Sequence, residues 1–498
     1  MRLDALLDRR DLPPPVAALD VRGLASDSRK VLPGYLFAAL PGAQRDGRQF
    51  IADALKRGAS AIVQEGPNPQ LQWEPDAPPQ LTIDNARRAL ALMARRFFRY
   101  LPSHIVAVTG TNGKSSVVEF LRQFWAAADR RAASIGTLGV RGTAHDKLFA
   151  LEHTTPEPVL LHHILRDLYA LGIDHLALEA SSHALTQARL DGVSIAAAGF
   201  TNLSRDHMDY HLNLSDYRAA KLRLFTELLP SKAPAVVHVG SAEGRAFAER
   251  VRQSGRKLIA VGGRSGGLAV LRQTSIAEGW DMKLSWQGRT YEWVLPLAGD
   301  FQVENVLTAM GLALASGLGM DQVVRTATAL TAPPGRMELI GQCPNGAPVF
   351  VDYAHTPAAL ARALQSLMPG GEGDIVLVFG CGGNRDQGKR SEMGRIAEEL
   401  ASHVILTDDN PRTEVPEHIR RQILAGMRAR SAVQDIGDRR AAIRTALEMA
   451  APGQTVLVAG KGHEEGQLVG RTLHPFSDRA VVEDCLQALR GEGRANNG

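Results

Sequence analysis

A glycine-rich segment, Gly110-Thr111-Asn112-Gly113-Lys114-Ser115-Ser116, stands between a β-branched run at residues 105–109 and a helical pattern. Strand, glycine loop and helix in this order are typical of a phosphate-binding loop, because backbone N–H groups and the helix N-terminus then face an anion. Lys114 is expected to meet the β- and γ-phosphates, and Ser115 to bind Mg²⁺. Val108 stands where the full pattern has its first glycine, so a glycine-rich turn that merely caps a helix is the alternative.

Short apolar runs alternate with helical patterns along most of the chain. Such alternation predicts an α/β fold with mostly parallel sheets and helices on both faces. The helical patterns include residues 85–100, 116–128, 157–171 and 217–229. The predicted strands lie at residues 105–109, 175–178, 195–201, 235–239, 258–261, 348–352, 374–379, 403–407 and 454–459.

The length of 498 residues predicts about three domains, since one domain takes roughly 100–200 residues. Ala332-Pro333-Pro334-Gly335 interrupts the alternation and marks a linker before the last domain. Residues 66–80, rich in proline and glutamine, are predicted to form a loop, and residues 268–296 a hairpin-like stretch. The tail at residues 491–498 is predicted to be disordered.

The formal net charge of +4 is small for this length and argues against a nucleic-acid binder that depends on a basic face. Cys343, Cys381 and Cys485 form no CxxC pair, so each is expected to be a small core residue rather than part of a disulfide or zinc site. Residues 1–12 lack the apolar core of a signal peptide, and the apolar stretch at 307–320 is too short to cross a membrane. We therefore expect a cytoplasmic protein with neither membrane nor nucleic acid as a partner.

Ionisable residues follow the predicted strands of the central region. Glu179 ends one strand, and strand carboxyl ends form the ligand crevice of an open α/β sheet, so it could hold a metal on nucleotide phosphates or simply cap the next turn. His207 follows another strand and is a candidate metal ligand, although a lone histidine is more often structural. Lys221 lies in the next helical pattern, where spacing alone predicts a surface lysine.

Four predicted strands of the last region also end in glycine-rich or charged clusters: residues 352–357, 379–386, 409–412 and 460–464. One such cluster could be a turn, but four indicate a binding face. Arg385 and Arg412 suit carboxylates by bidentate pairing, and Glu464 suits an ammonium group. Together they predict a receptor for a zwitterion that carries an additional carboxylate.

The chain resembles the Mur ligases, ATP-dependent amide-forming ligases of peptidoglycan precursor synthesis, in the order and spacing of residues 110–116, 179–183, 202–207, 352–357 and 460–464. The resemblance covers nearly the whole chain. It is greatest to members that add meso-diaminopimelate to UDP-N-acetylmuramoyl-L-alanyl-D-glutamate, through Asp27-Ser28-Arg29, residues 31–40 and Asp409-Asn410-Pro411-Arg412.

The resemblance implies three domains with separate tasks. Residues 1–100 would form a small α/β domain for the uridine-nucleotide substrate, residues 101–334 a P-loop-type parallel sheet for ATP, and residues 335–498 a Rossmann-like open sheet for the amino acid. ATP would phosphorylate the substrate carboxylate, and the amine would displace phosphate from the resulting acyl phosphate. Two Mg²⁺ ions would stabilise the transferred phosphoryl group. A hinge near residues 332–335 would let the domains for ATP and for the amino acid close together.

The resemblance also implies site residues. Those for ATP are Gly110, Thr111, Asn112, Gly113, Lys114, Ser115, Ser116, Asn305 and Arg336. Those for the UDP-muramoyl-dipeptide are Ser28, Gln44, Thr154, Thr155, Ser181, Gln187 and Arg189. Those for diaminopimelate are Arg385, Asp409, Asn410, Pro411, Arg412, Gly460 and Glu464. Those for magnesium are Ser115, Glu179, His207 and Lys221, the last as a CO₂-derived carbamate; Lys114, Glu179, His207 and Lys221 would be catalytic.

The chain departs from the family at Gln302 and His153, where asparagine is usual. The base that deprotonates the amine is either His355 or solvent. We expect the protein to be a monomer.

Three alternatives remain: a sibling ligase that adds another amine or glutamate, a P-loop NTPase switch without bond formation, and a nucleotide-binding scaffold without turnover. The clusters around Arg385 and Arg412 argue against the siblings, and a switch leaves those clusters without a role.

Overall fold

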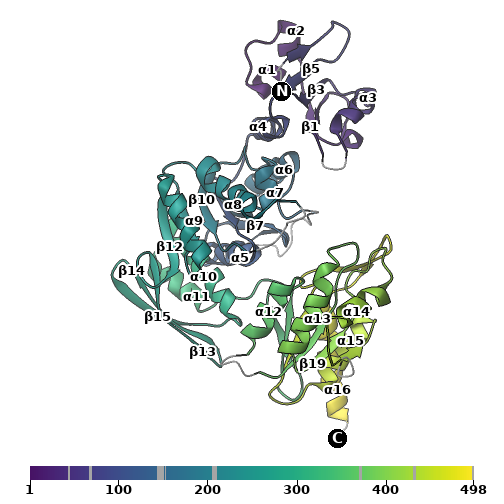
Figure 1. Ribbon diagram of the computed structural model, residues 1–498. Helices are drawn as coiled ribbons and strands as arrows, with labels where there is room; N and C mark the ends of the chain where they lie inside the picture. Colours follow the sequence, from purple (N-terminus) through teal and green to yellow (C-terminus); the bar gives the residue numbers. More distant parts are fainter. Residues whose placement is uncertain are drawn as a thin grey trace. The chain divides into compact units, whose positions relative to one another are not determined.

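The structure is a computed structural model that describes residues 1–42, 45–66, 70–142, 151, 153–204, 210–368, 373–429 and 433–495. It divides into two compact units, one of Met1–Ala269 with Leu307–Val323 and one of Val270–Val306 with Val324–Gly498. Each unit is α/β, as the alternation predicts (Figure 1). The boundaries expected near residues 100 and 334 stay a prediction.

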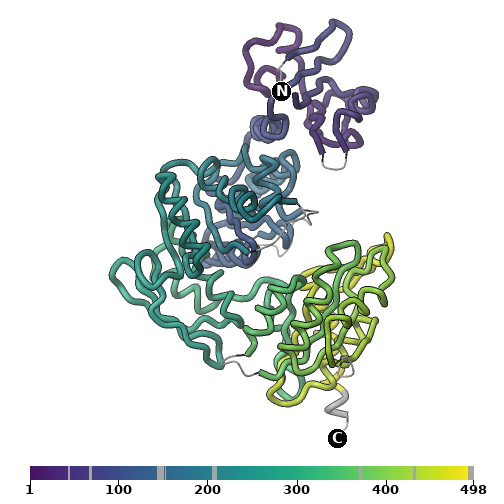
Figure 2. Tube along the Cα trace, viewed as in Figure 1, coloured from purple at the N-terminus to yellow at the C-terminus, as the bar shows by residue number. Residues whose placement is uncertain are grey.

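The first hundred residues form a small sheet of strand order β1-β2-β3-β5-β4, which is parallel except for the β4–β5 pair. Figure 2 follows this part from the purple N-terminus into the next sheet of the same unit. Its elements are α1 (Leu3–Leu7), α2 (Pro14–Ala17), β1 (Gly23–Ala25), η1 (Ser28–Lys30), β2 (Tyr35–Ala39), η2 (Gly47–Phe50), α3 (Ile51–Lys56), β3 (Ala61–Glu65), β4 (Gln70–Gln72), β5 (Gln80–Ile83) and α4 (Ala86–Phe98).

The second sheet of the first unit has strand order β13-β12-β11-β10-β6-β9-β7-β8, with β13 in this unit only as far as Ala269, and is parallel from β13 to β7. The carboxyl ends of β6, β9 and β10 therefore meet at one edge. Its elements are β6 (His104–Thr109), α5 (Lys114–Ala126), β7 (Ala132–Gly136), β8 (Gly139–Gly142), α6 (Pro158–Ala170), β9 (His175–Glu179), α7 (Ser182–Thr186), β10 (Ile195–Phe200), α8 (Leu214–Arg223), the π-helix η3 (Leu224–Leu228), β11 (Pro234–His238), α9 (Ala242–Gln253), β12 (Lys257–Gly263) and β13 (Leu268–Ile276).

The second unit contains the antiparallel hairpin of β14 (Gly279–Trp286) and β15 (Arg289–Leu295). Two helices, α10 (Asp300–Ala315) and α11 (Met320–Ala327), have residues in both units.

The main sheet of the second unit has the order β16-β17-β21-β18-β19-β20, with only β16 antiparallel. Successive residues of β18 enter different cores: Ile375 and Leu377 pack with α12 and α13, and Val376 and Val378 with α15 and α16. This alternation makes three layers. The elements are β16 (Glu338–Gln342), β17 (Pro348–Asp352), α12 (Pro357–Ser366), β18 (Ile375–Phe379), α13 (Gly388–Leu400), β19 (His403–Leu406), α14 (Pro416–Leu424), β20 (Val433–Asp435), α15 (Arg439–Met449), β21 (Thr455–Ala459), β22 (Gly466–Val469), β23 (Thr472–Pro475) and α16 (Asp478–Ala495).

Two local predictions are wrong. The predicted loop at 66–80 contains β4, which pairs with β5 through backbone groups that its polar side chains do not reveal. The tail is helical as far as Ala495, because α16 begins in the core with Val481, Val482 and Leu486 and continues outward. The three cysteines are buried and free, as expected. Among the described residues, no helix is long and apolar enough to cross a membrane.

His162 on α6 gives a test of this packing. It is 1% exposed, and burial, followed by the charge of Arg95, lowers its pKa from 6.5 to about 4. Because the folded-state pKa is depressed, the contribution to stability is full above about pH 6.5 and is lost as the pH falls toward about 4. We expect the urea-unfolding free energy of the parent protein to fall by about 2 kcal/mol more than that of His162→Leu between about pH 7 and pH 5. Equal pH dependence in the two proteins would contradict this account.

Candidate active site

The glycine-rich segment forms the loop between β6 and α5, as predicted. Gly110 has a φ of +152° and Gly113 a φ of +82°, and a Cβ at Gly110 would lie 1.8 Å from Thr201 Oγ1. Side chains larger than hydrogen are therefore excluded where the loop leaves the strand. Ser115 and Ser116 are buried in the first turn of α5. Backbone N–H groups and the positive helix end accordingly face the carboxyl edge of the sheet.

This loop is joined to the loop after β10, the neighbouring strand. The N–H groups of Thr111 and Asn112 donate to the main-chain and side-chain oxygens of Asn202, at 2.9 and 3.0 Å. Thr201 Oγ1 donates to Asn112 O at 2.6 Å, and Ser204 N donates to Thr111 Oγ1 at 3.0 Å. The first part of the predicted segment 202–207 thus supports the phosphate loop. His207 lies outside the described residues, and its predicted role as a metal ligand stays a prediction.

Two lysine ammonium groups meet at the start of the phosphate loop. Lys114 Nζ and Lys221 Nζ both donate to Gly110 O, at 3.0 and 2.8 Å, so the two nitrogens lie within about 6 Å of each other. Lys114 Nζ also donates to Thr111 O at 2.7 Å. Lys221 is 1% exposed, so the surface position expected from spacing alone is wrong. Two neighbouring cations favour an anion between or beside them.

Lys221 reaches the loop from α8, whose inner face also carries Tyr217. The Lys221 ammonium lies 4.1 Å from the Tyr217 ring centre, a cation–π contact, and Tyr217 OH donates to Thr111 Oγ1 at 3.2 Å. The π-helix η3 begins three residues after Lys221, and single π turns are frequent at functional sites. Arg223 anchors this end of α8 through Asp191, with contacts of 2.9 and 2.6 Å.

Glu179 lies at the end of β9 and is 1% exposed. Its carboxylate accepts from the Thr137 N–H at 2.8 Å and from Thr137 Oγ1 at 3.2 Å. Gly136 makes room for it, since a Cβ there would lie 2.0 Å from Glu179 Oε1. No sequence pattern points to Thr137, apart from its place after a strand that ends in glycine.

Five residues predicted for the dipeptide substrate lie beside Glu179. Thr155 Oγ1 donates to Glu179 O and Ser181 Oγ, at 2.8 and 3.2 Å, and Thr154 Oγ1 is 3.1 Å from Thr137 Oγ1. Arg189 Nη1 donates to Thr155 O at 2.6 Å, and Arg189 Nε and Nη2 donate to Gln187 Oε1 at 3.1 and 2.8 Å. Burial lowers the pKa of Arg189 below its usual range. These contacts bring together all five residues: Thr154, Thr155, Ser181, Gln187 and Arg189.

Of the other two residues predicted for this substrate, only Ser28 is described, and it lies in the part of the chain that forms the small sheet. Ser28 is buried in the short helix η1, where its side chain lowers the pKa of Asp53 by hydrogen bonding. Gln44 lies outside the described residues. His153 is exposed, next to Thr154.

The residues implied for magnesium fit this ion as a set only under one condition. Mg²⁺ prefers carboxylate and hydroxyl oxygens, which Glu179 and Ser115 supply, and it does not bind an ammonium group. Lys221 fits the set only if its Nζ carries a carboxyl group. In the described part of the chain, which excludes His207, no cluster of three histidine, cysteine or acidic residues could hold a metal.

In the second unit, the two further residues predicted for ATP are linked by Gln302. Asn305 Nδ2 donates to Gln302 Oε1 at 3.0 Å, and Gln302 Nε2 donates to Arg336 O at 2.9 Å. The glutamine at this position therefore bridges the predicted contacts. The Arg336 guanidinium lies 4.4 Å from the Tyr353 ring centre.

The diaminopimelate residues predicted after β19 are held by the β22–β23 hairpin. Arg412 N donates to Leu468 O at 2.9 Å, and Gln467 Nε2 donates to Asp409 O at 2.8 Å. Arg412 has a φ of +52°, uncommon for a residue with a side chain, and Arg412 Nη1 donates to Gly383 O at 2.8 Å. The Pro411 carbonyl also lies against Gly383, where a Cβ would come within 1.9 Å of it. The hairpin thus fixes the direction of the Arg412 side chain.

Two guanidinium groups face the same region. Burial, followed by the charge of Arg385, lowers the pKa of Arg412. Burial and then the Glu464 carboxylate raise the pKa of Tyr353, on which Asp409 and Arg385 also act. Gly460 lies against Asp409, since a Cβ there would be 2.7 Å from Asp409 Oδ2. A Cβ at Gly382 would lie 2.8 Å from Arg412 Nη1 and 3.8 Å from Arg385 Cγ, so the segments after these strands lie together and carry charges of both signs. That they form a binding face stays a prediction.

Arg390 is a supporting residue that sequence reasoning missed. It is fully buried, and it donates to Glu414 at 2.9 and 3.0 Å and to Gly382 O at 3.1 Å. Glu414 in turn accepts from Asn384 N. This pair fixes the loop that carries Arg385.

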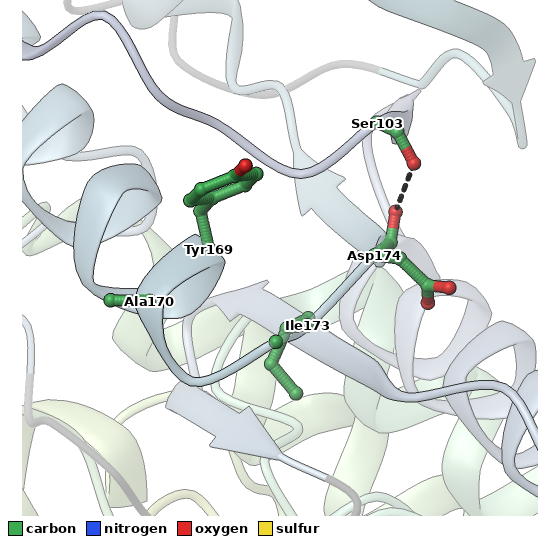
Figure 3. Close-up of a pocket in the computed structure, with 6 residues that line it drawn as sticks. Ser103, Tyr169, Ala170, Ile173 and Asp174 are labelled. Carbon is green, nitrogen blue, oxygen red and sulfur yellow. Dashed lines mark hydrogen bonds between the residues drawn. The ribbon is translucent and has the colours of Figure 1, made fainter.

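One pocket of about 380 Å³ has a different set of lining residues (Figure 3). It is lined by Ser103, Tyr169, Ala170, Gly172, Ile173 and Asp174, at the ends where β6 and β9 begin. Ser103 Oγ donates to Asp174 O at 3.4 Å across it. No predicted site residue lines this pocket.

Comparison with known proteins identifies the family. Three family models match: the Mur ligase family catalytic domain at residues 20–98, the Mur ligase middle domain at 108–313, and the Mur ligase glutamate ligase domain at 335–462. The UDP-N-acetylmuramoyl-L-alanyl-D-glutamate–2,6-diaminopimelate ligase of Mesorhizobium japonicum is 48% identical, over 95% of this chain and 96% of the relative. The chain belongs to the Mur ligase family.

Further Mur ligases match over nearly the full length. The ligase of the same name from Caulobacter vibrioides is 44% identical over 98% of this chain and 99% of the relative. A solved structure, also of a UDP-N-acetylmuramoyl-L-alanyl-D-glutamate–2,6-diaminopimelate ligase, is 32% identical with a TM-score of 0.70, over 98% and 99% of the two chains. Mur ligases are ATP-dependent enzymes that form amide bonds with ATP and Mg²⁺, and this chain is such a ligase, acting on small molecules.

The contact between Gly136 and Glu179 makes a sharp prediction for this Mur ligase. Gly136→Ala would force the Glu179 carboxylate from its two bonds to Thr137, and we expect kcat/KM for ATP-dependent phosphate release to fall about 10–100-fold. The melting temperature should fall by a few degrees, because the buried Glu179 carboxylate loses two bonds, while the backbone at Gly136 adds no strain of its own. Gly319→Ala is the matched control, since a Cβ at Gly319 meets nothing within 4 Å. Unchanged activity of Gly136→Ala would show that the exact position of Glu179 is unimportant.

Proposed function

We propose that this chain adds meso-diaminopimelate to the γ-carboxylate of the D-glutamate in UDP-N-acetylmuramoyl-L-alanyl-D-glutamate, in peptidoglycan precursor synthesis. The relatives that match over nearly their full length carry the name of this activity. The structural observation that carries the proposal is that Arg385 and Arg412 both lie against Gly382, while Asn410 joins Arg412 to Glu464 and Gly460 lies against Asp409. Two guanidinium groups and two carboxylates suit an amino acid with a second carboxylate.

The chemistry has two steps. The substrate carboxylate attacks the γ-phosphorus of ATP, which breaks the bond to the β-phosphate oxygen and gives an acyl phosphate and ADP. The amine of diaminopimelate then attacks the acyl carbon, the C–O bond to phosphate breaks, and the amine loses its proton. A carboxylate oxygen is otherwise a poor leaving group, which is why phosphorylation is needed.

The residues of the first unit would stabilise the transferred phosphoryl group. The Lys114 ammonium can turn from the carbonyls of Gly110 and Thr111 to the β- and γ-phosphates, so it has hydrogen-bond acceptors both without and with ATP. The N–H groups of the loop after β6 would bind phosphate oxygens. Magnesium, held by Ser115 and Glu179 with His207, would neutralise phosphate charge. Thr154, Thr155, Ser181, Gln187 and Arg189 would orient the peptide carboxylate beside it.

A carbamate on Lys221 is part of the proposal. The unmodified ammonium adds a second cation near Lys114, whereas a carbamate replaces it with an anion that has two oxygen atoms. Such a group could bind magnesium and also attract the Lys114 ammonium. Asn305 and Arg336 would contact ATP, and Ser28 and Gln44 the uridine nucleotide.

The remaining expectations complete the proposal. Residues 1–100, 101–334 and 335–498 would act as three domains for the uridine nucleotide, ATP and the amino acid. The enzyme would work as a monomer in the cytoplasm, and either His355 or solvent would take the proton from the amine.

Phosphate release tests the function directly. With ATP, Mg²⁺ and UDP-N-acetylmuramoyl-L-alanyl-D-glutamate, we expect kcat/KM for meso-diaminopimelate to exceed that for L-lysine by about 10–100-fold. L-lysine lacks the second carboxylate, so it forfeits one charge-assisted contact with a guanidinium.

D-alanyl-D-alanine and an amine-free reaction are the controls for this assay. Release that prefers another amine would keep the ligase activity and refute the assignment of Arg385 and Arg412. Release independent of any amine would indicate an NTPase switch and refute the proposal.

The carbamate can be tested by chemical rescue. Lys221→Ala should lose about 100-fold or more in phosphate release, and added short carboxylic acids should restore part of it by supplying the missing oxygen ligands. Lys232→Ala, at an exposed lysine, should show neither loss nor rescue. A Lys221→Ala protein as active as its parent would exclude the carbamate.

A further inference from the structure

Lys461 is a buried lysine in the amino-acid site to which no role has been given above. It is 0% exposed, and its ammonium group has three acceptors: Asn410 Oδ1 at 3.2 Å, Glu464 Oε2 at 2.9 Å and Gly466 O at 2.7 Å. An ammonium group has three N–H donors, so all of them are used by the protein. Lys461 therefore has no donor left for a ligand.

The bonds to Glu464 leave one of its oxygens available. Lys461 Nζ and Asn410 Nδ2 both contact Oε2, at 2.9 and 2.8 Å. Within the described part of the chain, no donor contacts Oε1. The Glu464 side chain is 33% exposed, so Oε1 can face a ligand.

The cationic side chains nearby offer Glu464 a competing partner. Arg412 Nη1 donates to Asn410 O at 3.4 Å, and the side chain of the same Asn410 donates to Glu464 Oε2 at 2.8 Å, so the Arg412 guanidinium lies in the same cluster as Glu464. A carboxylate released from Lys461 could turn to Arg412, and both groups would then be lost to a ligand. The bonds that Glu464 Oε2 accepts from Lys461 and Asn410 oppose this exchange.

The flanking residues hold Lys461 in place. Gly462 has a φ of +55°, and a Cβ there would lie 2.8 Å from both Gly335 O and Tyr353 Cβ. Asn410 is fixed from the other side, because Leu468 N donates to its Oδ1 at 2.8 Å. The ammonium group thus joins the loop after β21, the segment after β19 and the start of the β22–β23 hairpin.

We propose that Lys461 is a positioning residue that holds Glu464 away from Arg412, so that Glu464 Oε1 stays directed at the ammonium group of the incoming amino acid. It acts through Glu464 and Asn410 and does not touch the substrate. This inference rests on the proposed function, because it gives Glu464 its ligand.

The first variant is Lys461→Met, which keeps the length of the side chain and removes the charge. We expect KM for meso-diaminopimelate to rise at least tenfold, while KM for ATP and for the uridine-nucleotide substrate stays within twofold. Lys283→Met is the matched control, since Lys283 forms an exposed ion pair with Glu292 at 2.7 Å on the β14–β15 hairpin. If Lys461 had only a structural role, Lys461→Met would change kcat or the melting temperature but would not raise KM for diaminopimelate more than the other two KM values. This result would overturn the proposal.

A double-mutant cycle covers the case in which Lys461→Met does not fold. Lys461→Met/Glu464→Gln removes both charges of the pair together, which leaves no uncompensated buried charge. If Lys461 acts through Glu464, KM for diaminopimelate should match that of Glu464→Gln within twofold. A further tenfold rise in the double variant would refute the proposal. If the parent protein itself fails to release phosphate with diaminopimelate, the proposed function fails instead, so the two failures are distinct.

Discussion

Each unit of this Mur ligase contains a fully buried lysine whose hydrogen-bond acceptors lie beyond the carboxyl ends of parallel strands. Lys221 donates to Gly110 O after β6, and Lys461 donates to Asn410, Glu464 and Gly466 after β19 and β21. An ammonium group buried without acceptors would cost several kcal/mol, so the surrounding loops must adopt the shapes that satisfy it. These loops carry the predicted site residues. The arrangement of both sites therefore depends on where two buried lysine side chains can be accommodated.

The strand–helix alternation allowed the fold class and the position of most elements to be predicted, because parallel sheets with both faces covered leave continuous apolar runs. Residues 348–352, for example, coincide with β17. The short strand β4 escaped prediction because its polar residues pair only through the backbone. The helical end of α16 escaped prediction because a glycine-rich tail gives no helical signal, whereas the helix that begins with core residues runs on to Ala495.

In the candidate site, too, some residues could be predicted from the sequence and others could not. Residues in motifs, such as Lys114, Glu179 and Arg412, could be selected because glycine, charge and strand end occur together. Thr137 and Arg390 could not be selected, because each bonds to a residue far away in the sequence, and the spacing of residues does not reveal such a contact. The buried position of Lys221 followed from family resemblance alone. Lys461 stands inside a motif between two glycines, so a sequence signal was present, but its inward direction required the structure.

The contacts of Glu179 make two adjacent positions, 136 and 137, differ in their tolerance to substitution. One of its bonds comes from the main-chain N–H of Thr137, which every residue except proline would provide, so drift at position 137 can alter the hydroxyl bond without removing the other. Position 136 has no such freedom, because any β-carbon there occupies the space of the carboxylate. Adjacent positions in one turn thus face opposite evolutionary constraints. A survey of natural variation should find a permissive site directly beside an almost invariant one, although only one of the two has a side chain that touches the carboxylate.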